Sequence, residues 1–151
     1  MHNSISTLND LIQILKDGQQ GFQESAKDVQ SADLKTLFNE LSLQRSSFAG
    51  ELQALVVGLG EPEPETGGSL AGSLHRGWID LKSAVVTQDA HAILAECERG
   101  EDSAVAHYRE ALEDQDLPAD IRATVEKQSI AIKSSHDRVR DLRNALAPKE
   151  A

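Results

Sequence analysis

The sequence predicts an all-α four-helix bundle with a polar layer in its core. Apolar residues recur at the three-and-four spacing of a helix in four long segments. No segment alternates apolar and polar residues with period two, and aromatic residues make up only 3% of the chain, which leaves little from which to build a β-sheet. Near its middle, each apolar stripe carries one polar residue on the side that should be buried: Gln19, Arg45, Glu101 and Gln128.

The first two long helices are expected at residues 6–30 and 32–59. Ser6 can cap the first, whose apolar stripe is Leu8, Leu11, Ile12, Leu15, Phe22, Ala26 and Val29. The second stripe is Leu34, Leu37, Phe38, Leu41, Phe48, Leu52, Leu55, Val56 and Leu59. Because so few residues separate the two helices, they should lie side by side and antiparallel.

Residues 60–89 are expected to form a crossover that returns along the bundle. The crossover opens with GEPEPETGGS, whose Pro and Gly residues favour a loop. A short extra helix is expected at about 70–87, with the apolar stripe Leu74, Trp78, Leu81 and Val85. We expect Trp78 to anchor the crossover by burying its ring on the bundle. A crossover makes the second and third long helices parallel; the alternative is an up-down bundle with an appended hairpin.

The third and fourth long helices are expected at residues 90–115 and 118–146. Asp89 is the expected N-cap of the third, and Pro118 lies in the first turn of the fourth, where its missing N–H costs little. The apolar stripes are Ile93, Leu94, Cys97, Ala104, Tyr108, Ala111 and Leu112, and then Ile121, Val125, Ile132, Val139, Leu142 and Leu146. With 151 residues, the chain should form a single domain spanning 1–151.

Composition narrows the possible functions. The formal charge of −10 opposes nucleic-acid binding, which depends on clustered Lys and Arg. The longest apolar stretch is far shorter than the roughly 20 residues of a membrane span. The N-terminal residues do not resemble a secretory signal, and the single cysteine, Cys97, cannot form an intramolecular disulfide. We therefore expect a soluble, cytoplasmic protein whose partner, if it has one, is a second copy or another protein.

Three strings in the sequence are similar to a known family. They are FNELSLQRSSFAGEL, GSLHRGWIDLKSA and ECERGEDSAVAHY, and the likeness extends from LNDLIQILKDGQQGF to HDRVRDLR. The chain resembles the bacterial proteins of domain-of-unknown-function family 2383, a ferritin-like group. This resemblance implies a ferritin-like four-helix bundle, and it implies no activity, because none is established for the family.

The inward-facing side chains are a poor set of metal ligands. Di-metal bundles use a Glu from each of two helices and a Glu-x-x-His pair from each of the other two. The sequence contains no Glu-x-x-His. We expect no metal and no cofactor in the core, and no catalytic residues. The alternative is an iron or manganese site formed by Glu98, Glu101 and His136, as in a di-iron-type oxidoreductase or an iron-handling protein.

The polar layer is better interpreted as an ion pair. Arg45 beside Glu101 can form a bidentate, charge-assisted pair, with Gln19 or Gln128 satisfying the remaining hydrogen-bonding groups. The alternative is that these side chains lie at the edges of their stripes and reach water. Cys97 is expected to be a small core hydrophobe. The sequence thus favours a non-enzymatic structural or interaction protein, with the metal-dependent oxidoreductase and a partner-binding module as alternatives.

Overall fold

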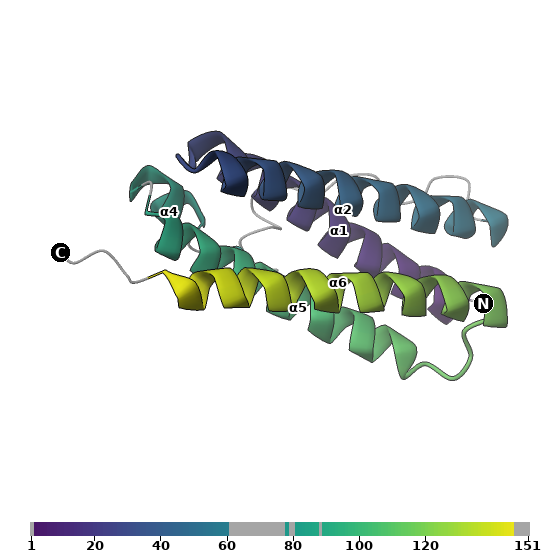
Figure 1. The fold of residues 1–151 in the computed structure, drawn as a ribbon. Helices are drawn as coiled ribbons and strands as arrows, with labels where there is room; N and C mark the ends of the chain where they lie inside the picture. The colour runs from purple at the N-terminus through teal and green to yellow at the C-terminus, as the bar shows by residue number, and fades with distance from the viewer. Residues whose placement is uncertain (1, 61–77, 79–80, 88, 147–151) are drawn as a thin grey trace.

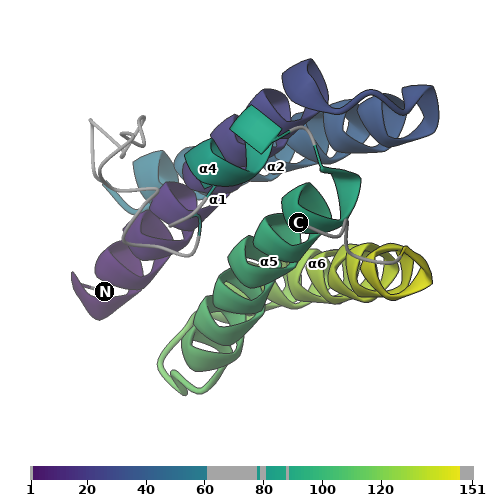
Figure 2. The same ribbon diagram turned by 90° about the vertical axis from the view of Figure 1, so that its left-hand side faces the viewer.

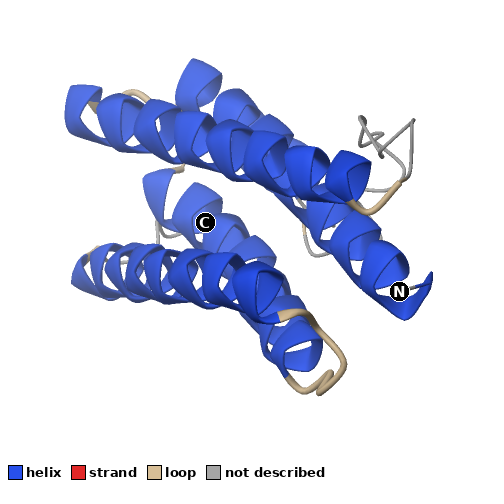
Figure 3. Ribbon diagram, turned by 90° about the vertical axis from the view of Figure 1, so that its right-hand side faces the viewer, coloured by secondary structure: helices blue, strands red, loops and turns tan. Residues whose placement is uncertain are grey.

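The fold is a bundle of four long helices joined by a crossover. The computed structural model describes residues 2–60, 78, 81–87 and 89–146. The long helices are α1 (His2–Asp28), α2 (Ala32–Gly58), α5 (Ala90–Leu112) and α6 (Ala119–Ala145), and a short helix, α4 (Leu81–Thr87), precedes α5. No strand occurs among the described residues (Figure 3), so the predicted all-α four-helix bundle is confirmed.

The bundle consists of two antiparallel hairpins that face each other (Figures 1 and 2). One hairpin is α1 with α2, and the other is α5 with α6. Across the interface α1 packs on α5, while α2 meets α6 less extensively. In Figure 1, α2 and α5 both run from left to right, so they are parallel. This direction agrees with the crossover topology and excludes the simple up-down alternative.

The helix ends follow local capping chemistry. Ser31 caps α2 by accepting a hydrogen bond from Leu34 N at 3.2 Å, and Asp89 caps α5 by accepting one from His91 N at 3.1 Å. The prediction that Ser6 caps the first helix is wrong, because α1 already begins at His2. Of the extra helix predicted at 70–87, only Leu81–Thr87 is described as helical; apart from Trp78, which is not in a helix, the rest lies outside the described residues.

The turn between α5 and α6 explains why α5 ends earlier than the predicted residue 115. Arg122 Nη1 donates to Leu112 O at 2.9 Å, and Arg122 Nη2 donates to Asp114 O. A basic side chain on the last carbonyls of a helix stabilises its end. Pro118, expected in the first turn of α6, occupies the N-cap position.

Apolar packing divides the core into two clusters with a polar layer between them. One cluster joins Leu8–Leu15, Ala49–Val56, Ala104–Ala111 and the first half of α6. The other joins Phe22–Val29, Leu34–Leu41, Trp78 with α4, Ile93–Cys97 and Val139. The apolar stripe of each long helix is interrupted at the same height. The interruptions are filled by Gly18 on α1, Arg45 on α2, Glu101 on α5 and Ser135 on α6.

The crossover is fastened to the bundle through Trp78, which is only 2% exposed. Its ring lies against two glycines on neighbouring helices, Gly21 on α1 and Gly100 on α5, and meets the Phe22 ring edge-on with the centroids 5.1 Å apart. A Cβ added at Gly21 would lie 2.6 Å from the indole. The two glycines therefore leave the space that the ring fills.

None of the helices that the structure describes combines the length and the apolar character needed to cross a membrane.

Candidate functional site

The centre of the bundle holds a buried ion pair between α2 and α5. Arg45 Nη2 donates to Glu101 Oε2 at 2.9 Å, and Arg45 Nη1 donates to Glu101 Oε1, so the contact is bidentate. The two residues are 1% and 0% exposed. Ser135 on α6 completes the group: its Oγ accepts from Arg45 Nη2 at 2.7 Å and donates to Glu101 Oε2 at 2.6 Å.

The surroundings hold the guanidinium in place and accept a hydrogen bond from its Nε. Arg45 Nε donates to Gln44 Oε1 at 3.2 Å. The guanidinium carbon lies 5.3 Å from the centre of the Phe22 ring, a cation–π distance. A Cβ at Gly18 would lie 3.4 Å from Nη1, an ordinary van der Waals contact, so α1 packs directly against the guanidinium at this point. The charges are thus both paired and hydrogen-bonded, which is the condition for tolerating them inside a protein.

The structure corrects the expected partners of this pair. Gln19 is half-buried, and its Oε1 accepts no hydrogen bond. Gln128 is buried but lies seven residues, or about two turns, before Ser135 on α6, so it reaches a different height. The residue that the sequence analysis missed is Ser135. Its signal was the gap between Ile132 and Val139 in the fourth apolar stripe.

Gln128 belongs to a second polar network that joins three helices. It accepts from the Tyr108 hydroxyl at 2.7 Å, and its Nε2 donates to Glu51 Oε1 at 3.0 Å and to Phe48 O at 3.3 Å. Burial raises the pKa of Tyr108 well above its ordinary value, so the phenol stays protonated and acts as a donor. This network ties α5, α2 and α6 together within the apolar cluster.

Cys97 lies inside the other apolar cluster and is 0% exposed. Its Sγ lies 3.5 Å from Ser25 Oγ. Burial raises the pKa of the Cys97 thiol well above its ordinary value, so the neutral thiol is the stable form. A nucleophilic or metal-binding cysteine needs the thiolate, so Cys97 fits the expected role of a small core residue.

The central residues do not fit a di-metal centre. Two divalent cations need several carboxylates and imidazoles that converge from different helices. The carboxylate of the central pair, Glu101, already bonds to Arg45 through both of its oxygens. The positive guanidinium itself lies where a cation would have to sit.

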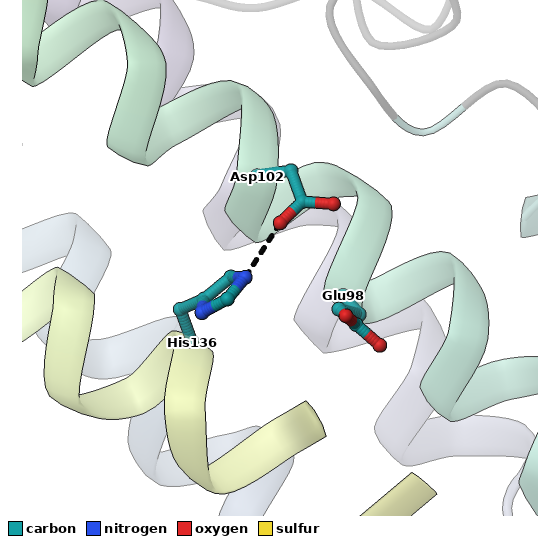
Figure 4. A group of neighbouring side chains, drawn as sticks. All are labelled: Glu98, Asp102 and His136. Carbon is teal, nitrogen blue, oxygen red and sulfur yellow. Dashed lines mark hydrogen bonds and ion pairs between the residues drawn. The ribbon is translucent and has the colours of Figure 1, made fainter. Parts of the chain in front are cut away.

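A group of possible metal ligands lies instead on the flank where α5 and α6 meet (Figure 4). Glu98 and Asp102 leave α5 one turn apart, and His136 comes from α6 on the same side. One ligand atom from each lies within 4.8 Å of the others. We call these three residues the flank cluster. The alternative metal set of Glu98, Glu101 and His136 is thereby corrected: Glu101 is turned into the core, and its neighbour Asp102 takes its place.

His136 is held by carboxylates on both ring nitrogens. Nε2 lies 2.5 Å from Asp102 Oδ1, and Nδ1 lies 2.9 Å from Asp137 Oδ1. Partial burial lowers the pKa of His136, but the hydrogen bonds with Asp137 and Asp102 outweigh it, and the pKa is raised overall. Lys133 and His136 hydrogen-bond to Asp137 and lower its pKa to about 2. The ring is therefore fixed in orientation by charged partners.

Comparison with known proteins gives one match. A family model described as a domain of unknown function (DUF2383) matches residues 3–114, which run from the first turn of α1 to just beyond the end of α5. No curated protein matches the chain.

Proposed function

The chain belongs to DUF2383, a family of unknown function, and from this premise we propose that it is a non-enzymatic, ferritin-like bundle that serves as a structural or interaction protein. The observation that carries the proposal is the central ion pair of Arg45 with Glu101, closed by Ser135. A single buried cysteine and a charge of −10 suit a cytoplasmic protein that does not bind nucleic acid.

The central ion pair supports this role over a di-metal oxidoreductase because it occupies the place of the reactive centre. A bundle enzyme of that kind keeps its ligands free to bind cations and its interior open to a substrate. Here the inward carboxylate is committed to Arg45, and the Phe22 ring and Gly18 pack against the guanidinium. Such a centre fixes the register of four helices and leaves contacts with partners to the outer surface.

The metal content of the centre tests this proposal. Protein purified without chelator should contain no iron or manganese that depends on Glu101. The informative variant is Arg45→Met with Glu101→Leu, which removes the carboxylate without leaving a lone buried charge. The measurement is made in a His136→Gln background, so that the flank cluster does not contribute. Stoichiometric iron or manganese in that background, lost in the paired variant, would restore the oxidoreductase alternative.

The outer face of α2 is the surface best suited to contact a partner. Leu43 is 71% exposed and Val57 is 51% exposed. Four residues between them are exposed, and three of these are small and uncharged; the fourth is Glu51. We call the uncharged set the α2 outer stripe: Leu43, Ser47, Gly50, Ala54 and Val57. Their spacing of four, three, four and three residues is that of a helix seam that packs on another helix.

The α2 outer stripe fits a second copy of the chain. Two copies that each carry a charge of −10 repel one another wherever their acidic surfaces meet, and this stripe contains no charge. Leu43 lies seven residues before Gly50 and Val57 seven residues after it. An antiparallel pair of α2 helices would therefore place Leu43 of one copy against Val57 of the other, with the two glycines close together. Glu51 beside the stripe is engaged by Gln128.

A matched pair of variants tests self-association. Leu43 on α2 and Ile130 on α6 are both 71% exposed, but the exposed neighbours of Ile130 along α6 include the charged Glu126, Lys127 and Lys133. Sedimentation equilibrium should show a dimer for the wild type, a monomer for Leu43→Glu and an unchanged dimer for Ile130→Glu. A monomeric wild type, or equal effects of the two variants, would remove the second copy as the partner.

A further inference from the structure

We propose that the flank cluster of Glu98, Asp102 and His136 binds one divalent transition-metal ion. The site is independent of the proposed structural role, because it lies on the flank of the bundle and uses none of the central residues. Its donors are one imidazole nitrogen and two carboxylate oxygens from two helices. Ions such as Zn²⁺ and Mn²⁺ accept this mixture, whereas Mg²⁺ and Ca²⁺ prefer oxygen ligands alone.

The geometry needs only a small adjustment to hold an ion. Glu98 and Asp102 are four residues apart on α5, which places both carboxylates on one face of the helix. The three ligand atoms lie within 4.8 Å of one another. Nitrogen and oxygen ligands lie about 2.0–2.2 Å from a bound zinc ion, so a pair of them is separated by roughly 3–4 Å. The 2.5 Å contact of His136 with Asp102 would open slightly as the ion enters between them.

A hydrogen bond outside the cluster already orients the imidazole as a ligand. Asp137 holds His136 Nδ1 at 2.9 Å, and Lys133 and Arg140 contact the same carboxylate at 2.7 and 3.3 Å. Metal-binding histidines commonly donate their second N–H to a carboxylate in this way. The arrangement keeps the Nδ1 proton toward Asp137 and directs Nε2 at Asp102.

Glu98 supplies an oxygen that the protein leaves without a hydrogen bond. Its Oε1 is buried and accepts none, although Arg143 Nε lies 3.0 Å away as an ion-pair partner. Binding replaces the proton on His136 Nε2 by the metal: the N–H bond breaks, the proton leaves to solvent and the nitrogen lone pair coordinates the ion. Arg143 opposes binding through its positive charge. Removing that charge should therefore strengthen metal binding, whereas removing a ligand should weaken it.

The test is calorimetric titration of the full chain, purified free of metal, with Zn²⁺ and with Mn²⁺. Asp102→Asn and His136→Gln should each weaken binding at least about tenfold, Asp137→Asn should weaken it about tenfold through the orientation of His136, and Arg143→Gln should strengthen it. Two controls on the same helices are His107→Gln on α5 and Asp141→Asn on α6, which should leave affinity unchanged. Circular dichroism of each variant verifies that the fold is retained.

A nitrogen NMR measurement separates coordination from general attraction to an acidic protein. Adding Zn²⁺ should shift His136 Nε2 strongly, while Nδ1 keeps the signature of a protonated nitrogen. The proposal is overturned by wild-type protein that binds neither ion, by affinity that survives both Asp102→Asn and His136→Gln, or by equal shifts at all the histidines. Stronger binding in Arg143→Gln, together with loss in His136→Gln, supports the assignment of these residues.

Discussion

Trp78 packs against Gly100, so closely that a Cβ at position 100 would overlap the indole ring. The contact explains a glycine in the middle of α5, where helix propensity alone would disfavour it. It also explains how residue 78 of the crossover is fixed to the bundle. Gly21 on α1 packs against the same ring, so the indole contacts both hairpins.

Gly100→Ala should destabilise the protein and expose Trp78. The added methyl forces the ring or the helix to move, at a cost of about 1–3 kcal/mol, which exceeds the roughly 1 kcal/mol that Ala gains over Gly in a helix. Urea unfolding should show the loss, and tryptophan emission should shift to longer wavelength. Gly50→Ala is the matched control, with both changes measured in the monomeric Leu43→Glu background: no atom lies within 4 Å of a Cβ at Gly50, so the change should stabilise the monomer by about 0.5–1 kcal/mol. An equal effect of the two changes would contradict the role of Trp78.

Helix positions follow from the apolar stripes, but relations between helices depend on information that the stripes lack. Arg45 and Glu101 could be predicted as inward residues because a charge in the middle of a stripe stands out. Ser135 could not, because a small polar residue is compatible with either face of a helix. The height of Gln128 could not be decided by counting outward from the turn, because that count leads from Glu101 to a position between Gln128 and Ser135.

The flank cluster also could not be predicted from the apolar stripe of one helix. A helical wheel points Glu101 inward and turns Asp102 by about 100° to one side. Whether that side faces α6 or solvent depends on which helix lies on each side of α5. The sequence of α5 alone does not contain that arrangement. The structure places α6 there, so Asp102 meets His136, and Glu101 meets Arg45.

The central ion pair should behave as a unit in a double-mutant cycle. Glu101→Leu or Arg45→Met alone should cost about 3–5 kcal/mol, because one charge is left buried without its partner. The combination Arg45→Met with Glu101→Leu should be close to neutral, since neither charge remains. Free energies of unfolding from urea titrations provide the measurement. Additive single and double effects would show that the two residues do not interact.

The second polar network should depend on the Tyr108 hydroxyl. Tyr108→Phe keeps the ring in the apolar cluster but removes the donor to Gln128 Oε1. Leaving that buried oxygen unsatisfied should cost about 1–3 kcal/mol. Gln128→Leu in the Tyr108→Phe background removes the unsatisfied oxygen and should recover part of the loss. If Tyr108→Phe unfolds at the wild-type urea concentration, the hydrogen bond does not contribute to stability.

Cys97 should be unreactive in the folded protein and should make stability fall at alkaline pH. The pKa of its thiol is raised by burial, whereas an unfolded thiol ionises near about 8.5. The contribution of the protonated thiol is therefore fully present below about pH 8.5 and declines as the pH rises above it, because only the unfolded chain releases the proton. Between about pH 8.5 and 10, before tyrosine ionises, the free energy of unfolding of the wild type should fall by up to about 1.4 kcal/mol per pH unit more than that of Cys97→Ala. A thiol reagent should modify the native protein only at the rate of unfolding. Rapid labelling without urea, or parallel pH profiles for the two proteins, would place Cys97 outside the sealed core.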